Sequence, residues 1–188
     1  MAVILGIDEV GRGSWAGPLV AGAVVLTVPI NGIRDSKKIS RSRREDLANT
    51  IKILADSWAL GWVQPHEINV IGLTEAVRLA MKRAKEQIIC RYDEVIIDGN
   101  FNYLSTDVRS RAVVKADETI TAVSAASIIA KVARDAYMRE QATIYPSYGF
   151  ETHVGYGTKQ HAASLRLYGV CPLHRRNYKP IKAIINSF

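Results

Sequence analysis

Near its start the chain has an apolar strand that runs directly into two acids and then into a glycine-rich turn. Residues 4–17 read ILGIDEVGRGSWAG, and a second apolar run follows at 19–28. Two such runs joined by so short a turn predict neighbouring buried strands that pair antiparallel. Carboxylates at the end of a buried strand are costly unless they are paired or bind a cation. Asp8 and Glu9 therefore either cap the strand or pair with Arg12, or they bind a cation, and this stretch alone leaves both interpretations open.

Apolar runs and helical periodicity alternate along the rest of the chain. Further strands are predicted at 57–63, 94–97 and 112–114, with helices after Ser40 or Ser42 and at about 67–89, 120–143 and 158–168. This order predicts an α/β domain around one mixed sheet, with the first three strands antiparallel and the later strands parallel beside the first. The helix at 120–143 is dense in serine and alanine, and such small side chains allow a helix to approach a sheet closely.

Size, charge and cysteine usage narrow the class of protein. A chain of 188 residues fits one domain with a small appendage. The net charge of +7 favours a polyanionic partner, although a basic surface can also serve solubility alone. Cys90 and Cys171 lie far apart, which argues for a reducing compartment and against a disulfide framework or a zinc site. Since no signal peptide and no apolar run long enough to cross a bilayer is found, we expect a cytoplasmic protein without membrane association.

The C-terminal part has a different composition from the rest. Residues 145–179 contain five tyrosines and five lysine or arginine residues but only one acid, Glu151. Basic residues interleaved with aromatic ones suit contacts with phosphates and stacking on nucleotides. We therefore predict a main domain over residues 1–144 and a basic, aromatic substrate-binding extension over residues 145–188, packed on the same domain.

Acids stand at the ends of three predicted strands. Asp8 and Glu9 end the first strand, Asp98 ends the fourth, and Asp117 follows the fifth. Ligands of α/β sheets collect at the carboxyl ends of strands, where four carboxylates would repel one another unless a cation neutralised them. Mg²⁺ or Mn²⁺ fits such a set, and two ions about 4 Å apart can support phosphodiester hydrolysis. Adjacent residues of a regular strand face opposite sides, so Glu9 would need a twist of the strand, or would contribute through its backbone carbonyl or indirectly.

These residues belong to a series of motifs that resembles ribonuclease HII, the type 2 ribonuclease H. The series covers nearly the whole chain in order: GIDEVGRG at 6–13, DSKK at 35–38, IDG at 97–99, KAD at 115–117, SAASIIAK at 124–131, GYGT at 155–158 and HRR at 174–176. Two departures are visible. Val10 replaces the usual alanine, and Ser14 and Trp15 stand where proline and an aliphatic residue are common.

The resemblance implies a ribonuclease H-like fold, a five-stranded mixed sheet flanked by helices with a small helical C-terminal extension. It implies endonucleolytic cleavage of the RNA strand in RNA–DNA hybrids. It also implies incision 5′ of single ribonucleotides in duplex DNA, as in ribonucleotide excision repair. Two Mg²⁺ or Mn²⁺ ions would serve the reaction, the products would carry 5′-phosphate and 3′-hydroxyl ends, and the protein would be a monomer.

The resemblance also assigns roles to residues. The catalytic and metal-binding acids would be Asp8, Glu9, Asp98 and Asp117. Substrate contacts would come from a turn that senses the 2′-hydroxyl at an RNA–DNA junction, a tyrosine that packs on the deoxyribose beyond it, and basic residues that position phosphates: Gly11, Arg12 and Gly13; Tyr156; and Lys37, Lys38, Arg175 and Arg176. Glycine suits the turn because its exposed backbone can approach a sugar closely.

Several other polar residues have structural explanations. Lys131 and Asp135 are one helical turn apart and predict an ion pair. Ser124 and Ser127 suit close packing, and His174 is expected to be structural or to face a phosphate. Two rival functions are a nucleic-acid-binding protein with a structural metal and a junction-resolving nuclease, which would also cut all-DNA substrates.

Overall fold

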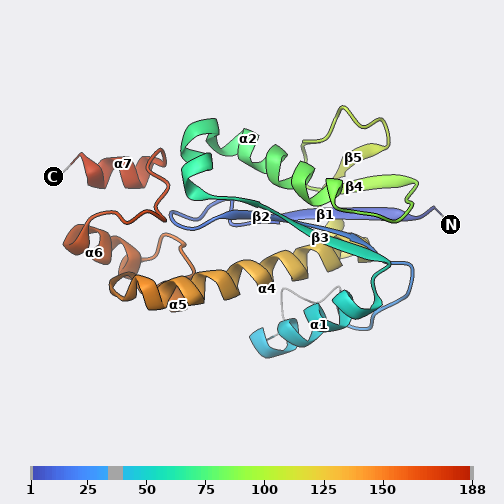
Figure 1. Ribbon diagram of the computed structural model, residues 1–188, viewed down its shortest axis with the longest axis horizontal. Coiled ribbons are helices and arrows are strands. Elements are labelled where there is room, and N and C mark those ends of the chain that lie inside the picture. Colours follow the sequence, from blue (N-terminus) through green and yellow to red (C-terminus); the bar gives the residue numbers. More distant parts are fainter. Residues whose placement is uncertain (1, 34–39, 187–188) are drawn as a thin grey trace.

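The computed structural model describes residues 2–33 and 40–186 and contains one five-stranded sheet (Figure 1). The strands are β1 (Ile4–Val10), β2 (Leu19–Val25), β3 (Ser57–Val63), β4 (Glu94–Asp98) and β5 (Ser110–Val113). The helices are α1 (Arg41–Leu54), α2 (Pro65–Glu86), α3 (Ala116–Thr119), α4 (Thr121–Ile144), α5 (Phe150–His153), α6 (Lys159–Tyr168) and α7 (Lys179–Ile185), with a 3₁₀ turn η2 (Pro146–Tyr148).

The sheet has the strand order β3-β2-β1-β4-β5. β1 pairs antiparallel with β2, and β2 pairs antiparallel with β3, whereas β4 runs parallel to β1 and β5 runs parallel to β4. The predicted mixed sheet is therefore confirmed, with the first three strands antiparallel and the later two parallel beside the first. β1 lies at the centre and carries the first two acids.

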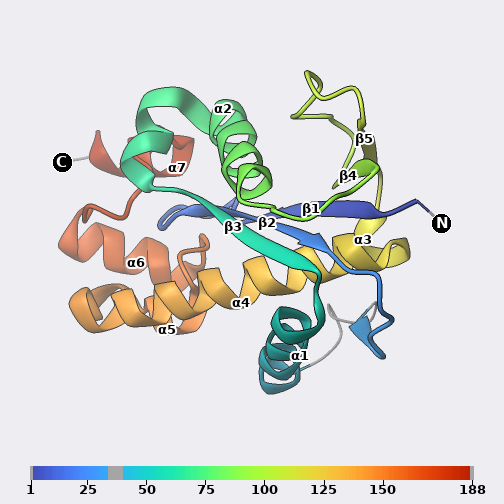
Figure 2. The same ribbon diagram turned by 45° about the vertical axis from the view of Figure 1, so that its right-hand side comes forward.

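Helices cover both faces of the sheet, as Figures 1 and 2 show from two directions. α2 packs on one face, and α1 and α4 pack on the other. All seven residues of β2 are buried: Ala21 and Ala23 contribute to the core beneath α2, and Val24 contributes to the core beneath α1 and α4. Because both faces of this strand are covered, its sequence is apolar without alternation.

Glycines in the strands let α4 approach the sheet at backbone distance. A Cβ built on Gly6 would lie 2.3 Å from the backbone of Ala122, and one built on Gly22 would lie 2.3 Å from the carbonyl oxygen of Ala126. Real side chains do not tolerate such contacts, so a larger residue would push the helix away from the sheet. The predicted close approach of the small-residue helix is confirmed.

The helix boundaries follow local capping. Ser40 caps α1, since its hydroxyl accepts a hydrogen bond from the Arg43 amide. α2 begins earlier than expected because Gln64 and Glu67 form a capping box at its start. Gly72, at a φ of 78°, interrupts α2 and forms a kink that the periodicity did not indicate.

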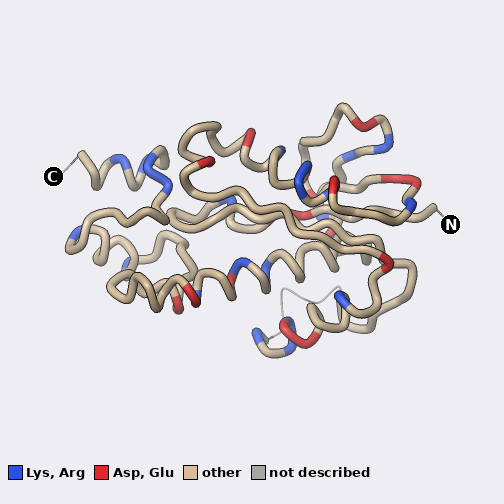
Figure 3. The backbone as a smooth tube through the Cα atoms, viewed as in Figure 1, with Lys and Arg blue, Asp and Glu red and all other residues tan. Residues whose placement is uncertain are grey.

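The C-terminal elements pack around the far end of α4. Met138 and Ala142 of α4 form a buried cluster with Phe150, Leu165 and Ile181 from α5, α6 and α7. α6 and α7 carry basic but no acidic residues, as Figure 3 shows. The division of the chain at residue 144 stays a prediction. No helix in the described part of the chain is long and apolar enough to span a membrane.

Candidate functional site

β1 stays paired with β2 for longer than it stays paired with β4. β1 pairs with β2 as far as Val10, whereas its parallel pairing with β4 ends where Ile7 meets Ile97. The ends of β1 and β4 therefore diverge one residue before Asp8 and Asp98, and a pocket opens at this point. The acids occupy the position where the sheet stops being continuous.

The structure brings the four predicted acids together in one pocket of about 420 Å³. Asp8 and Glu9 come from β1, Asp98 ends β4, and Asp117 lies in α3 directly after β5. The backbone amide of Asp117 donates to Oδ1 of Asp98 at 3.4 Å, which joins two of these elements. The rest of the lining consists of Val10, Arg44, Ser127, Ile128 and Lys131.

Burial in this pocket disfavours the charged forms of Asp8 and Glu9. Burial raises the pKa of Asp8 to about 7, partly opposed by a hydrogen bond with Ser127 and reinforced by the charges of Glu9, Asp98 and Asp117. Burial also raises the pKa of Glu9, and the positive charge of Arg12 opposes this rise. Crowded, buried carboxyl groups of this kind suit a hard divalent cation, which would favour their charged forms.

Glu9 is directed toward the glycine turn. Its Oε1 lies 3.5 Å from Nη1 of Arg12, and its side chain is 12% exposed. β1 stays paired with β2 beyond Glu9, so both acids line the pocket without a break in the strand. Across residues 2–33 and 40–186, no three acidic, histidine or cysteine side chains already form a metal-binding cluster.

A frame of hydrogen bonds holds the glycine turn from the C-terminal side. The amide of Trp15 donates to the carbonyl of Gly155 at 2.9 Å, and the hydroxyl of Tyr178 donates to the carbonyl of Arg12 at 2.7 Å. Arg12 and Gly13 themselves remain exposed. The turn is thus held by hydrogen bonds from the C-terminal part of the chain, while Arg12 and Gly13 are exposed to solvent.

Arg175 lies inside the protein and not on the surface that the phosphate contact required. Its side chain is fully buried, with Nε donating to the carbonyl of Gly17 at 3.0 Å and Nη1 donating to the carbonyl of Arg12 at 3.2 Å. This placement corrects the prediction, because a guanidinium engaged by buried carbonyls cannot also reach a phosphate. Its neighbour Arg176 is exposed.

Tyr156 borders the same turn although it is far away in sequence. Its half-buried ring lies over two cations: its centroid is 5.7 Å from Nζ of Lys131 and 5.3 Å from the guanidinium carbon of Arg134. A Cβ on Gly157 would lie 2.1 Å from the indole of Trp15. The Tyr156 segment and the turn therefore interlock.

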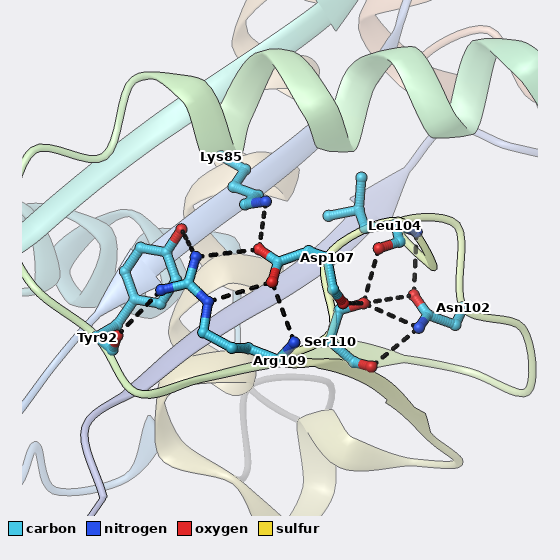
Figure 4. A network of polar contacts seen from close by, with 7 residues as sticks. All are labelled: Lys85, Tyr92, Asn102, Leu104, Asp107, Arg109 and Ser110. Carbon is cyan, nitrogen blue, oxygen red and sulfur yellow. Dashed lines mark hydrogen bonds and ion pairs between the residues drawn. The ribbon is translucent and has the colours of Figure 1, made fainter.

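The loop between β4 and β5, whose internal polar contacts Figure 4 shows, also contacts the exposed arginine of the turn. Arg109 and Lys85 pair with Asp107 and hold the pKa of that carboxyl well below its usual range. Tyr103, on the same loop, has its ring centroid 5.9 Å from the guanidinium carbon of Arg12. A braced loop thus contacts the exposed arginine of the turn.

Three C-terminal histidines form a buried cluster beneath Tyr156. Nε2 of His161 lies 3.0 Å from Nε2 of His174, and the rings of His153 and His161 stack with centroids 4.5 Å apart. Burial lowers the pKa of both His161 and His174 to about 4, so these rings are neutral near pH 7. Nδ1 of His161 lies 2.9 Å from the carbonyl oxygen of Tyr156. Of the two roles expected for His174, the structure therefore has the structural one.

The remaining predicted residues have separate outcomes. Lys37 and Lys38 lie outside the described residues. Nζ of Lys131 is 3.0 Å from Oδ1 of Asp135, so the predicted ion pair is confirmed. The hydroxyl of Ser124 donates to the carbonyl of Asp117 and so supports the segment that carries this acid.

Sequence reasoning missed several residues of the site. None of the motifs in the sequence includes Arg44, and Ser127 was expected only to serve close packing, yet both line the pocket. Arg134 was not expected at the site, because it stands among the other charged residues of this helix, such as Lys131 and Asp135, and no local pattern marks it as buried. Trp15 was noted only as a departure from the motif, whereas its ring packs on Gly157.

Comparison with known proteins gives one consistent family. The chain matches the family model described as Ribonuclease HII over residues 5–181. It is similar to ribonuclease HII of Neisseria meningitidis serogroup C, with 44% identity over 96% of this chain and 94% of that protein. It is also similar to ribonuclease HII of Polynucleobacter asymbioticus, with 43% identity over 100% of this chain and 98% of that protein.

Solved structures agree with this result. The ribonuclease H2 from Pyrococcus horikoshii OT3 has a TM-score of 0.84 and 26% identity, covering 98% of this chain and 97% of that one. The RNase HII from Archaeoglobus fulgidus, solved as a complex with PCNA, has a TM-score of 0.75 and 28% identity, covering 94% and 95%. The predicted ribonuclease H-like fold is therefore confirmed.

Proposed function

This chain belongs to the ribonuclease HII family of metal-dependent endoribonucleases, which act on RNA in RNA–DNA hybrids, and we propose that it also incises duplex DNA 5′ of a single embedded ribonucleotide. The products would carry 5′-phosphate and 3′-hydroxyl ends. The observation that carries this proposal is the adjacency of the four-acid pocket to an exposed, rigidly supported glycine turn, joined by the pair between Glu9 and Arg12.

Asp8, Glu9, Asp98 and Asp117 would hold the divalent cations, Mg²⁺ or Mn²⁺. The support is electrostatic, since the pKa values of Asp8 and Glu9 are raised by burial and by neighbouring acids. Two bound cations would supply activation of a water molecule and stabilisation of the leaving oxygen. The protein's own part is to present the carboxylates, with Ser127 holding Asp8.

The glycine turn would recognise the ribose. A Cβ on Gly13 would meet nothing within 4 Å, so the backbone at this position is open to a sugar, whereas Gly11 and Gly17 are packed from behind. The 2′-hydroxyl is the group that distinguishes RNA from DNA, and backbone groups at close range can read it. Tyr156, beside the turn, would pack on the adjacent deoxyribose, so that the pair of sites reads an RNA–DNA junction.

Basic residues outside the pocket would position the phosphate backbone. Arg176 is exposed, and Lys37 and Lys38 keep the same proposed role. α6 and α7, which lack acids, would extend this basic surface. We further propose that the protein acts as a monomer in the cytoplasm, in ribonucleotide excision repair.

The decisive experiment uses three substrates: a DNA duplex with one internal ribonucleotide, a long RNA–DNA hybrid, and an all-DNA duplex. Each is incubated with Mg²⁺, with Mn²⁺ and with EDTA. We expect incision 5′ of the ribonucleotide and cutting of the hybrid, with no cutting of the all-DNA duplex and none in EDTA.

Other outcomes would identify a different function. Cutting of the hybrid but not of the single-ribonucleotide duplex would remove the junction role of Arg12 and Tyr156. Cutting of all-DNA substrates would indicate a resolving nuclease, and tight binding without cleavage would indicate a binding protein.

A further inference from the structure

Arg134 on α4 joins the glycine turn to the segment that carries Tyr156. Its side chain is fully buried, and each of its three guanidinium nitrogens donates to a backbone carbonyl. Nε donates to Pro18 at 2.9 Å and Nη2 donates to Ala16 at 3.1 Å, both directly after the turn. Nη1 donates to Val154 at 2.9 Å, two residues before Tyr156. One planar group therefore fixes the spacing of two segments that are far apart in sequence.

The same guanidinium contacts both parts of the proposed junction site. A Cβ on Gly11 would lie 2.3 Å from Nε of Arg134, so the turn rests directly on this side chain. The ring of Tyr156 lies over the guanidinium at 5.3 Å. A change in the position of Arg134 would therefore move the turn and the tyrosine relative to each other.

Arg175 supports the turn in a similar way. It is also fully buried, and it bonds the carbonyls of Arg12 and Gly17 and the hydroxyl of Tyr178. These partners of Arg134 and Arg175 are neutral oxygens, and burying a cation with neutral partners costs free energy that an apolar side chain would avoid. Unlike an apolar side chain, however, each arginine has a planar guanidinium group with several hydrogen-bond donors at fixed angles.

We propose that Arg134, together with Arg175, is a positioning residue that sets the distance between the Gly11–Gly13 turn and Tyr156, and with it the preference for a single-ribonucleotide junction over a continuous hybrid. This inference rests on the proposed function. At a junction, one ribose and one deoxyribose must meet their two sites at the same time. A continuous hybrid presents a 2′-hydroxyl at every sugar of the RNA strand, so an error in spacing costs it less.

The test compares Arg134→Lys and Arg175→Lys with Arg83→Lys as the matched control. Lysine keeps the positive charge but has a single donor group that cannot span several carbonyls. Arg83 also bonds a backbone carbonyl, that of Trp62, but it lies between β3 and α2 and away from the turn. kcat and KM are measured for each variant on the single-ribonucleotide duplex and on a long hybrid, and folding is checked by thermal unfolding.

We expect the ratio of kcat/KM on the junction to kcat/KM on the hybrid to fall about tenfold in Arg134→Lys, less in Arg175→Lys and not at all in Arg83→Lys. If one of the first two variants does not fold, the other decides. An unchanged ratio in a folded variant would overturn the inference, whether activity is kept on both substrates or lost equally on both. Failure of both to fold would also count against it, because the arginines would then serve the fold alone. A wild-type protein that does not incise the single-ribonucleotide duplex would instead refute the proposed function.

Discussion

Nη1 of Arg12 lies 3.5 Å from Oε1 of Glu9, so the exposed arginine of the glycine turn is paired with an acid of the pocket. The residue proposed to meet the substrate and a residue proposed to bind metal thus share one interaction. A cation in the pocket would draw Glu9 away from Arg12, and a phosphate near the turn would draw Arg12 away from Glu9. Binding of metal and of substrate are therefore expected to assist each other.

Asp98→Asn should reduce cleavage by about a thousandfold or more, because it removes one of the charges that would hold the cations. Asp98 ends β4, and asparagine preserves its shape, so thermal unfolding should change little. Single-turnover cleavage of a long hybrid in Mg²⁺ measures the loss. Glu75→Gln is the control, an exposed acid of α2 far from the pocket, and it should remain fully active. Full activity of Asp98→Asn would sink the assignment of the acids.

Tyr156→Ala should lose about ten times more activity on a single-ribonucleotide duplex than on a long hybrid, since the ring is expected to pack on the sugar at the junction. Tyr168→Ala provides the matched control, because this tyrosine is also C-terminal and is 59% exposed on α6. Initial rates on both substrates give the comparison. Equal losses on the two substrates would argue against a junction role for Tyr156.

Two glycine substitutions should separate packing from recognition. Gly22→Ala should lower the free energy of unfolding by about 1–3 kcal/mol, because the new methyl group meets the Ala126 carbonyl of α4. Gly13→Ala has open space around it and should change stability by less than about 0.5 kcal/mol, yet it should reduce cleavage because the methyl group would stand where the sugar is proposed to bind. Urea unfolding and cleavage assays test both. Full activity of Gly13→Ala would contradict the proposed role of the turn.

The stability of the metal-free protein should depend on pH because the carboxyl group of Asp8 is buried. Its pKa is raised to about 7 from an ordinary value of 3.8, so its burial is best tolerated below pH 3.8 and becomes progressively more costly as pH rises through 7. In EDTA, Asp8→Asn should therefore raise Tm relative to wild type at pH 8, by about 3 °C or more, and by less at pH 5. Calorimetry at the two pH values measures the difference. A gain that is the same at both would mean that Asp8 does not titrate in this range.

Acid should destabilise the C-terminal cluster of histidines. The pKa values of His161 and His174 are lowered to about 4 from an ordinary 6.5, so the unfolded chain takes up protons first. Stability is fully present above pH 6.5 and is lost as pH falls toward 4. Urea unfolding between pH 7 and 4.5 should show this decline, and it should be shallower in His174→Gln. His66→Gln, on the exposed first turn of α2, serves as control and should keep the wild-type slope. A wild-type slope in His174→Gln would exclude this explanation.

Much of the fold followed from local patterns in the sequence. The uninterrupted apolar run of β2 indicated a strand buried on both faces, and the short turn before it indicated antiparallel pairing; both features are present. The grouping of Asp8, Asp98 and Asp117 followed from a general rule, that strand ends of an α/β sheet converge. These features depend on residues close together in sequence or on topology alone.

Other features depended on tertiary contacts that no local pattern reports. Arg175 looked like a surface cation, and only its burial against the carbonyls of Arg12 and Gly17 assigns it to the interior. The kink at Gly72 was hidden because apolar periodicity continues on both sides of it. The direction of Glu9 followed from its partner, Arg12, and not from the alternation of strand faces.

α4 fixes the interval between the four-acid pocket, where cleavage is proposed, and Tyr156, where recognition of the junction is proposed. Ser127 bonds Asp8 in the pocket, and Arg134, seven residues later on the same side of the helix, lies beneath Tyr156. At about 1.5 Å per residue, this interval spans about 10 Å, and the helix approaches the sheet too closely to slide. Removing one residue between the two would turn the second site by about 100° as well as shorten the interval. The spacing of the two sites can therefore change only in steps of a whole helical turn, and an enzyme with a different footprint on its substrate would need a different helix.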